Sequence, residues 1–198
     1  MIGTLLTITT MALTATASQP YTDTEILWQA KNNCRNVNPK KVNEKLLAEL
    51  LKIEKSWGVP DSLRGFLLAS ACQESGYNPN AEGDHRFSKN RRPKAIGLFQ
   101  MWPWWESKRW GYGIDRRNPT QAANTYLHHI SRLLNKVRRR CKISKRNVKK
   151  NWIVAWVTGI RGVKKNGNRC RERPKHLRTL KKWHRAIKRE RRINGMAR

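Results

Sequence analysis

Acidic residues are scarce in this chain of 198 residues, which has 13 Asp and Glu against 43 Lys and Arg. Its formal net charge of +30 is typical of proteins that bind a polyanion: nucleic acid, an anionic lipid surface or an anionic cell wall. The sequence also lacks an apolar run of about 20 residues, the length that a membrane-spanning helix needs. The charge narrows the class of partner but does not choose among the three.

Cysteine is limited to positions 34, 72, 141 and 170, and no pair has the Cys-x-x-Cys spacing of zinc or redox sites. The five histidines have no carboxylate or cysteine at a metal-ligand spacing, so no metal and no other cofactor is expected. The four cysteines are either two disulfides of an exported protein or four buried thiols. For the exported case we expect a Cys141–Cys170 disulfide, because these cysteines flank an apolar run at 152–160.

Charged residues are absent before Asp23, and residues 2–17 form a mildly apolar run that ends in Ala-Thr-Ala. This small-x-small ending resembles a signal-peptidase site, although no Lys or Arg precedes the run. We therefore expect residues 1–17 to be an export signal and the protein to be secreted or periplasmic in a bacterium. The alternative is a disordered or misassigned N-terminus.

Hydrophobic residues recur mainly at helical spacing, which predicts a mainly α fold. Residues 76–118 lack this period and are rich in Gly, Pro, Asn and aromatics, which predicts long loops with a short helix or hairpin. We divide the chain into a helical segment at 18–60, a catalytic domain at 61–160 and a basic helical extension at 161–198. Helices are expected to begin at Asn38-Pro39, Asp61, Asn118-Pro119, near Trp152 and at Pro174.

Glu74 continues the apolar stripe formed by Leu63, Leu67 and Ala71 on one helix. A carboxylate on a buried stripe is expected to have a raised pKa and could act as a general acid. The alternative is a glutamate that turns to solvent at the end of the helix.

Three short elements carry a resemblance to a known family. Residues 73–81 read QESGYNPNA, residues 95–100 read AIGLFQ, and residues 122–127 read AANTYL. In this order they resemble the soluble lytic transglycosylases and the goose-type lysozymes, and the resemblance covers residues 61–135. It implies a lysozyme-like helical fold and cleavage of peptidoglycan between N-acetylmuramic acid and N-acetylglucosamine.

By the same resemblance Glu74 is the catalytic acid, and other residues form the sugar site: Gly97, Phe99, Gln100 and Tyr126. Tryptophans follow directly in the WPWW run at 102–105, with Trp110 nearby, and their indole rings could hold a saccharide. We choose Trp102 as the residue that lines the cleft. For Phe99 and Gln100 the alternatives are a core aromatic residue and a surface amide.

Two departures from the family bear on the reaction. Where the family has Ala-Tyr-Asn-Ala-Gly, residues 155–159 read AWVTG, so the tyrosine hydroxyl and the amide are missing. The aspartate that hydrolytic relatives use is also missing after Gln100, and Asp84 and Glu82 are the possible second carboxylates. We therefore expect transglycosylation, which yields an anhydro sugar end. Hydrolysis, with an altered acetylation preference, remains the alternative.

The last third of the chain is strongly basic, with 25 Lys and Arg but only two Glu from residue 136 to residue 198. We expect this part to attach the enzyme to an anionic wall or membrane surface. Two alternatives are a solvated face of a helix packed through Leu177, Leu180 and Trp183, and a nucleic-acid-binding protein. No zinc-finger, RNA-recognition or zipper pattern supports nucleic acid.

Overall fold

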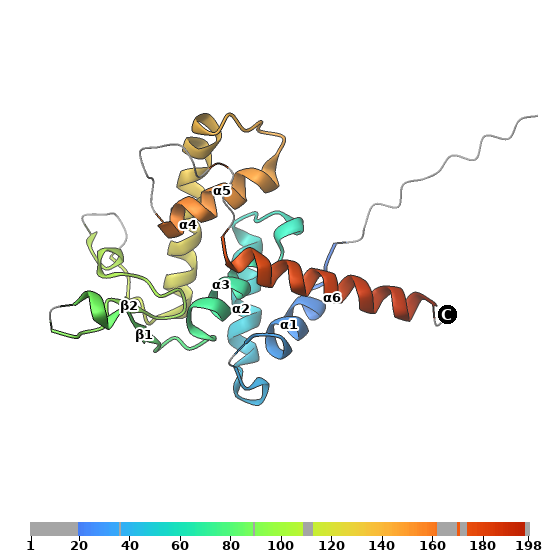
Figure 1. The fold of residues 1–198 in the computed structure, drawn as a ribbon, viewed down its shortest axis with the longest axis horizontal. Coiled ribbons are helices and arrows are strands. Elements are labelled where there is room, and N and C mark those ends of the chain that lie inside the picture. Colours follow the sequence, from blue (N-terminus) through green and yellow to red (C-terminus); the bar gives the residue numbers. More distant parts are fainter. Residues whose placement is uncertain are drawn as a thin grey trace, which may run out of the picture.

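The computed structural model describes residues 20–35, 37–88, 90–108, 113–161, 170 and 174–196. The expected export signal at 1–17 and Trp110 lie outside the described residues. Within the described ranges the protein is mainly helical, as the sequence predicts (Figure 1). The α-helices are α1 (Asp23–Asn32), α2 (Glu44–Ser56), α3 (Phe66–Ser75), α4 (Pro119–Arg140), α5 (Val148–Arg161) and α6 (His176–Met196).

The long loops between α3 and α4 contain a small antiparallel hairpin of β1 (Glu82–Gly83) and β2 (Ala95–Ile96). Short 3₁₀ turns precede α2 and α3, η1 (Pro39–Lys41) and η2 (Asp61–Leu63), and two more lie in these loops, η3 (His85–Phe87) and η4 (Pro103–Trp105). The expected loops with a hairpin are therefore present between residues 76 and 118.

Two expected helix starts are wrong in detail. The helix expected at Asn38-Pro39 stops after one 3₁₀ turn, and Asn43 caps a new helix, α2, through its side chain. The helix expected at Asp61 is also only a 3₁₀ turn, and α3 begins after Gly65. Gly65 has a φ of +89°, and a Cβ there would lie 2.8 Å from Ile26, so the chain turns where only glycine fits.

Other expected helix ends are confirmed. The Asn118 side chain accepts a hydrogen bond from the backbone N–H of Gln121 and so caps α4. Gly76 adopts the left-handed conformation that ends α3, with a φ of +60°.

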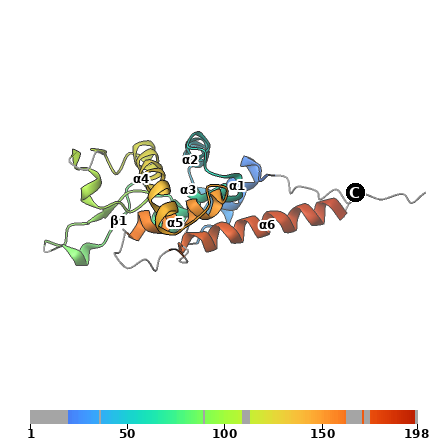
Figure 2. The ribbon, with the colours of Figure 1, turned by 90° about the horizontal axis from the view of Figure 1, so that it is seen from above.

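The centre of the molecule is α3, whose residues 66–72 are all buried. It contacts α1, α2 and α6, and α6 also packs along α1 (Figures 1 and 2). The apolar stripe of α6 belongs to the same core as α1 and α3, through Leu177, Leu180, Trp183 and Ile187. The basic C-terminal helix is therefore packed on the rest of the protein through its apolar stripe, while its cations remain at the surface.

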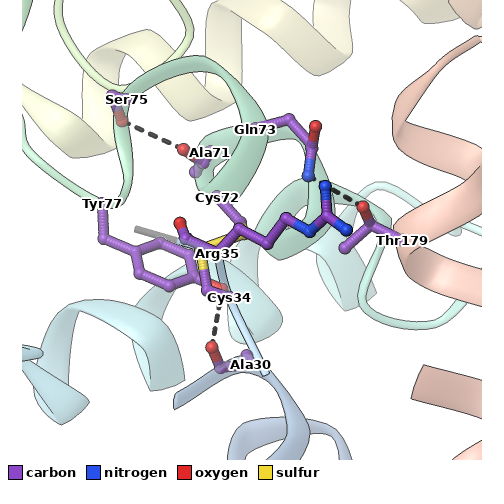
Figure 3. Close-up of a disulfide and its surroundings, with 9 residues drawn as sticks. All are labelled: Ala30, Cys34, Arg35, Ala71, Cys72, Gln73, Ser75, Tyr77 and Thr179. Carbon is purple, nitrogen blue, oxygen red and sulfur yellow. Dashed lines mark hydrogen bonds between the residues drawn. A yellow bond between two sulfur atoms is a disulfide. The ribbon is translucent and has the colours of Figure 1, made fainter. Parts of the chain in front are cut away.

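Two disulfides cross-link the described residues. Cys34–Cys72 ties the segment after α1 to the last turns of α3 (Figure 3), and Cys141–Cys170 is the pair expected from the sequence. Disulfides persist in oxidising compartments, so both are compatible with an extracellular or otherwise oxidising location. None of the described helices combines the length and the apolar character needed to cross a membrane.

Candidate functional site

Glu74 occupies the last turn of α3, next to the residues that end the helix. The Ser75 hydroxyl donates to the carbonyl of Ala71 at 3.0 Å, and the Gly76 N–H bonds back into the same turn. These contacts fix the backbone on the C-terminal side of Glu74. Its side chain is 21% exposed, so the carboxylate is largely buried but still open to a ligand.

His176, the first residue of α6, and Lys175, directly before it, supply the partners of this carboxylate. His176 is fully buried, and its Nε2 lies 2.6 Å from Oε1 of Glu74. Lys175 approaches the same oxygen, with Nζ at 3.4 Å. An interaction across 102 residues of sequence thus forms the centre of the site.

The pKa of Glu74 lies below its ordinary value of 4.5, contrary to the expectation from the sequence. Burial is the largest single influence and raises this pKa. The hydrogen bond and charge of His176, together with Lys175, lower the pKa by more. The expectation was wrong because the apolar stripe of one helix shows burial but not the cations of a distant helix.

Aromatic side chains pack behind Glu74 and His176. The Trp156 ring stacks on His176 with 5.7 Å between centroids, and its indole N–H donates to the Tyr126 hydroxyl at 3.0 Å. Tyr126 in turn stacks on Phe99 at 4.7 Å. Burial raises the pKa of Tyr126, and the negative charge of Glu74 adds to this effect. Three of the expected residues, Glu74, Tyr126 and Phe99, therefore meet in one chain of contacts.

Tyr126 and Phe99 are almost completely buried, so they support the site from behind and offer little surface to a sugar. Trp156 stands where the family resemblance places a tyrosine. It cannot offer a hydroxyl to the acid, and it contacts His176 instead. His176, Lys175 and the contact made by Trp156 are the parts that sequence reasoning missed.

Gly97 and Gln100 shape the loop beside the hairpin. Gly97 has a φ of +80°, and a Cβ there would lie 2.1 Å from the carbonyl oxygen of Arg116. The Gln100 amide nitrogen donates to the carbonyls of Ala81 at 3.2 Å and Gly97 at 3.1 Å. These contacts indicate a bracing role in the loop, with the amide nitrogen already engaged by the protein.

Trp102 and Asp84 lie together on a second surface, which we call the hairpin patch and define as Asp84, Phe87, Lys94 and Trp102. The Trp102 indole N–H donates to Oδ2 of Asp84 at 3.0 Å. Phe87 and Lys94 approach the Trp102 ring at 5.9 Å and 5.6 Å. Trp102 is 37% exposed and Phe87 is 48% exposed, so the patch offers aromatic surface to a ligand. The contact with Trp102 occupies one oxygen of the Asp84 carboxylate.

No group of three or more His, Cys, Asp or Glu side chains that could hold a metal ion occurs in the part of the chain that the structure describes. In comparisons with known proteins, no protein-family model and no curated protein matches the chain. The geometry of the site and the three short motifs are therefore the basis for a functional assignment.

Proposed function

We propose that this protein cleaves the glycan strands of bacterial peptidoglycan as a lytic transglycosylase, with Glu74 as its single acid. One observation carries the proposal. Glu74 lies in the last turn of a buried helix and keeps an exposed edge. It is hydrogen-bonded to the buried His176, on which the Trp156 ring stacks. The mainly helical architecture around α3 is compatible with a lysozyme-like fold, which is part of the same proposal.

In the proposed reaction, protonated Glu74 gives its proton to the oxygen of the bond between N-acetylmuramic acid and N-acetylglucosamine. As that bond breaks, the C6 hydroxyl of the muramic residue attacks C1 and closes the anhydro ring. Glu74 then takes the proton of that hydroxyl, which restores the acid for the next cleavage. One carboxyl group serves as acid and then as base, so no water is consumed.

The lowered pKa of Glu74 imposes a condition on this reaction. In the free protein His176 and Lys175 favour the carboxylate, whereas donation needs the protonated form. A bound glycan would cover the exposed edge of Glu74 and increase its desolvation, which raises the pKa. Activity is therefore expected to be highest at acidic pH.

The exposed cations of α6 support attachment to an anionic wall, because the apolar stripe of this helix is already packed. The test measures two properties of the whole protein: clearing of a peptidoglycan suspension and binding to duplex DNA. We expect clearing of the suspension at acidic pH. Retardation of DNA on a gel without any clearing would instead assign a nucleic-acid-binding protein.

A further inference from the structure

A basic pocket opens beside Glu74, between α3, the segment after α1, and the start of α6. It has a volume of about 330 Å³, within the range of sites that hold small ligands. Four cations line it: Arg35, Lys175, Arg178 and Lys182. The other lining residues are the neutral polar side chains of Asn33, Gln73 and Thr179, so no carboxylate faces the four cations within the lining.

The walls of this pocket are cross-linked to one another. Arg35 and Gln73 directly follow the two cysteines of the Cys34–Cys72 disulfide, which holds these two walls together. The Gln73 amide donates to the Thr179 hydroxyl at 2.9 Å and ties α3 to α6. Figure 3 shows the Arg35 side chain extending from the disulfide toward Gln73 and Thr179. The cations therefore surround a space fixed by a covalent bond and a hydrogen bond.

Lys175 links the pocket to the candidate acid. It lines the pocket, and its Nζ lies 3.4 Å from Oε1 of Glu74. Gln73 is also a lining residue and precedes Glu74 in the chain. An anion in the pocket would consequently be a neighbour of the bond to be cleaved.

We propose that this pocket binds the carboxylates of a peptide stem carried by the glycan strand. The inference rests on the proposed function, because peptidoglycan is the polymer whose sugar units carry acidic peptides. Each muramic residue bears its stem on the lactyl group, so a strand held at Glu74 carries carboxylates within reach of the pocket. Several Lys and Arg side chains around one space match a ligand with two carboxylates.

The test measures binding to the full chain at low salt, with a defined probe: N-acetylmuramoyl-L-alanyl-D-glutamate, which has two free carboxylates. The altered protein is Arg178→Gln with Lys182→Gln, both in the pocket. The matched control is Arg185→Gln with Arg189→Gln, which has the same spacing, helix and charge change but lies outside the lining. We expect about tenfold weaker binding for the pocket variant and less than about twofold for the control.

Three results would overturn the proposal. Equal losses in the two variants would indicate attraction by net charge alone. Equal binding of the probe with both carboxylates amidated would show that the carboxylates are not recognised. Tighter pocket-dependent binding of inorganic phosphate or a glycerol phosphate oligomer would assign the pocket to a phosphate polymer.

Cleavage assays separate this inference from the proposed function. If the parent protein clears walls but the pocket variant binds the probe unchanged, the pocket inference fails and the function stands. If the parent shows pocket-dependent binding without cleaving any glycan, the function fails and the pocket stands. When both hold, the pocket variant should lose activity on intact peptidoglycan and keep it on strands stripped of their stems.

Discussion

A glutamate side chain lies at each end of α3, and the two side chains differ in environment. Glu54, from α2, lies at the N-terminal end, fully buried, and accepts hydrogen bonds from the backbone N–H groups of Gly65 at 2.6 Å and Leu67 at 2.9 Å. Glu74 lies at the C-terminal end, partly exposed, with His176 and Lys175 as partners. One carboxylate completes the start of a helix, and the other keeps an exposed edge beside a histidine and a lysine.

Burial raises the pKa in both cases, but the neighbours decide the outcome. Burial raises the pKa of Glu54 to about 7, because the two backbone N–H groups and Arg64, whose guanidinium lies 3.8 Å away, offset only part of it. At Glu74 a hydrogen-bonded histidine and a lysine outweigh burial and lower the pKa. A glutamate on a buried stripe is therefore not by itself a protonated acid.

Glu74→Gln should have the largest effect. Gln keeps the shape of the side chain but cannot deliver a proton, so wall clearing should fall by about a thousandfold. The thermal unfolding midpoint should stay close to that of the parent protein, because the side chain is at the surface edge of the core. Clearing within tenfold of the parent would remove Glu74 from the mechanism.

The two disulfides should stabilise the fold alike but differ in their effect on the site. Each closes a loop of similar length, with separations of 38 and 29 residues, and should contribute about 4 kcal/mol in the chain-entropy model. Replacing Cys34 and Cys72 by Ala should also weaken activity, since this bond holds α3 near Glu74. Replacing Cys141 and Cys170 should lower stability while the remaining folded protein keeps its activity; denaturant titration and clearing assays measure both.

Glu54→Gln should reverse the pattern of Glu74→Gln. An amide cannot accept both backbone hydrogen bonds through two oxygens, so one buried N–H loses its partner, at a cost of about 1–3 kcal/mol in unfolding free energy. Activity of the folded fraction should be retained. Unchanged stability together with lost activity would show that Glu54 serves the reaction and not the stability of the fold.

The same residue predicts a pH dependence of stability. The folded pKa of Glu54, about 7, is higher than the ordinary 4.5, so the folded state binds more protons between these values. Its contribution, about 3 kcal/mol, is fully present below pH 4.5 and is lost as pH rises through 7. Denaturant unfolding from pH 4.5 to 8 should show this decline, and Glu54→Gln should flatten it.

A smaller effect is expected for His176→Gln. The amide can still hydrogen-bond to Glu74 but carries no charge, so the pKa of Glu74 should rise. Because a higher pKa keeps Glu74 protonated up to higher pH, the pH profile of wall clearing should move to higher pH, while activity at the parent's acidic optimum is retained. A merely structural histidine would change the amount of folded protein and leave the shape of this profile unaltered.

Local patterns predicted much of the fold. Helical spacing predicted the mainly α class, and the Asn118 cap and Gly76 predicted helix ends that the structure contains. The break before Asn43 and the turn at Gly65 were missed, because they depend on a second cap and on close packing against Ile26. The Asn43 cap is a local pattern that competes with the earlier Asn38-Pro39 pattern, whereas the packing of Gly65 against Ile26 leaves no local signal in the sequence.

The site was predictable only in part, for the same reason. The motifs indicated Glu74, and the structure places Tyr126 and Phe99 in the same chain of contacts. His176 follows Pro174 at the start of a helix whose apolar stripe is visible in the sequence, but no local pattern pairs it with α3. The hydrogen bond across the core, and with it the sign of the pKa shift at Glu74, could be learned only from the structure.

The central claim is that Glu74 cleaves glycan strands with one carboxyl group and without water. Mass spectrometry of peptidoglycan digested by the parent protein, by Glu74→Gln and by Asp84→Asn tests this claim most directly. We predict muropeptides with 1,6-anhydromuramic ends, one water lighter than a lysozyme digest, from the parent and Asp84→Asn but not from Glu74→Gln. Reducing ends throughout, lost in Asp84→Asn, would show a hydrolase that uses Asp84 to activate water and would contradict the account.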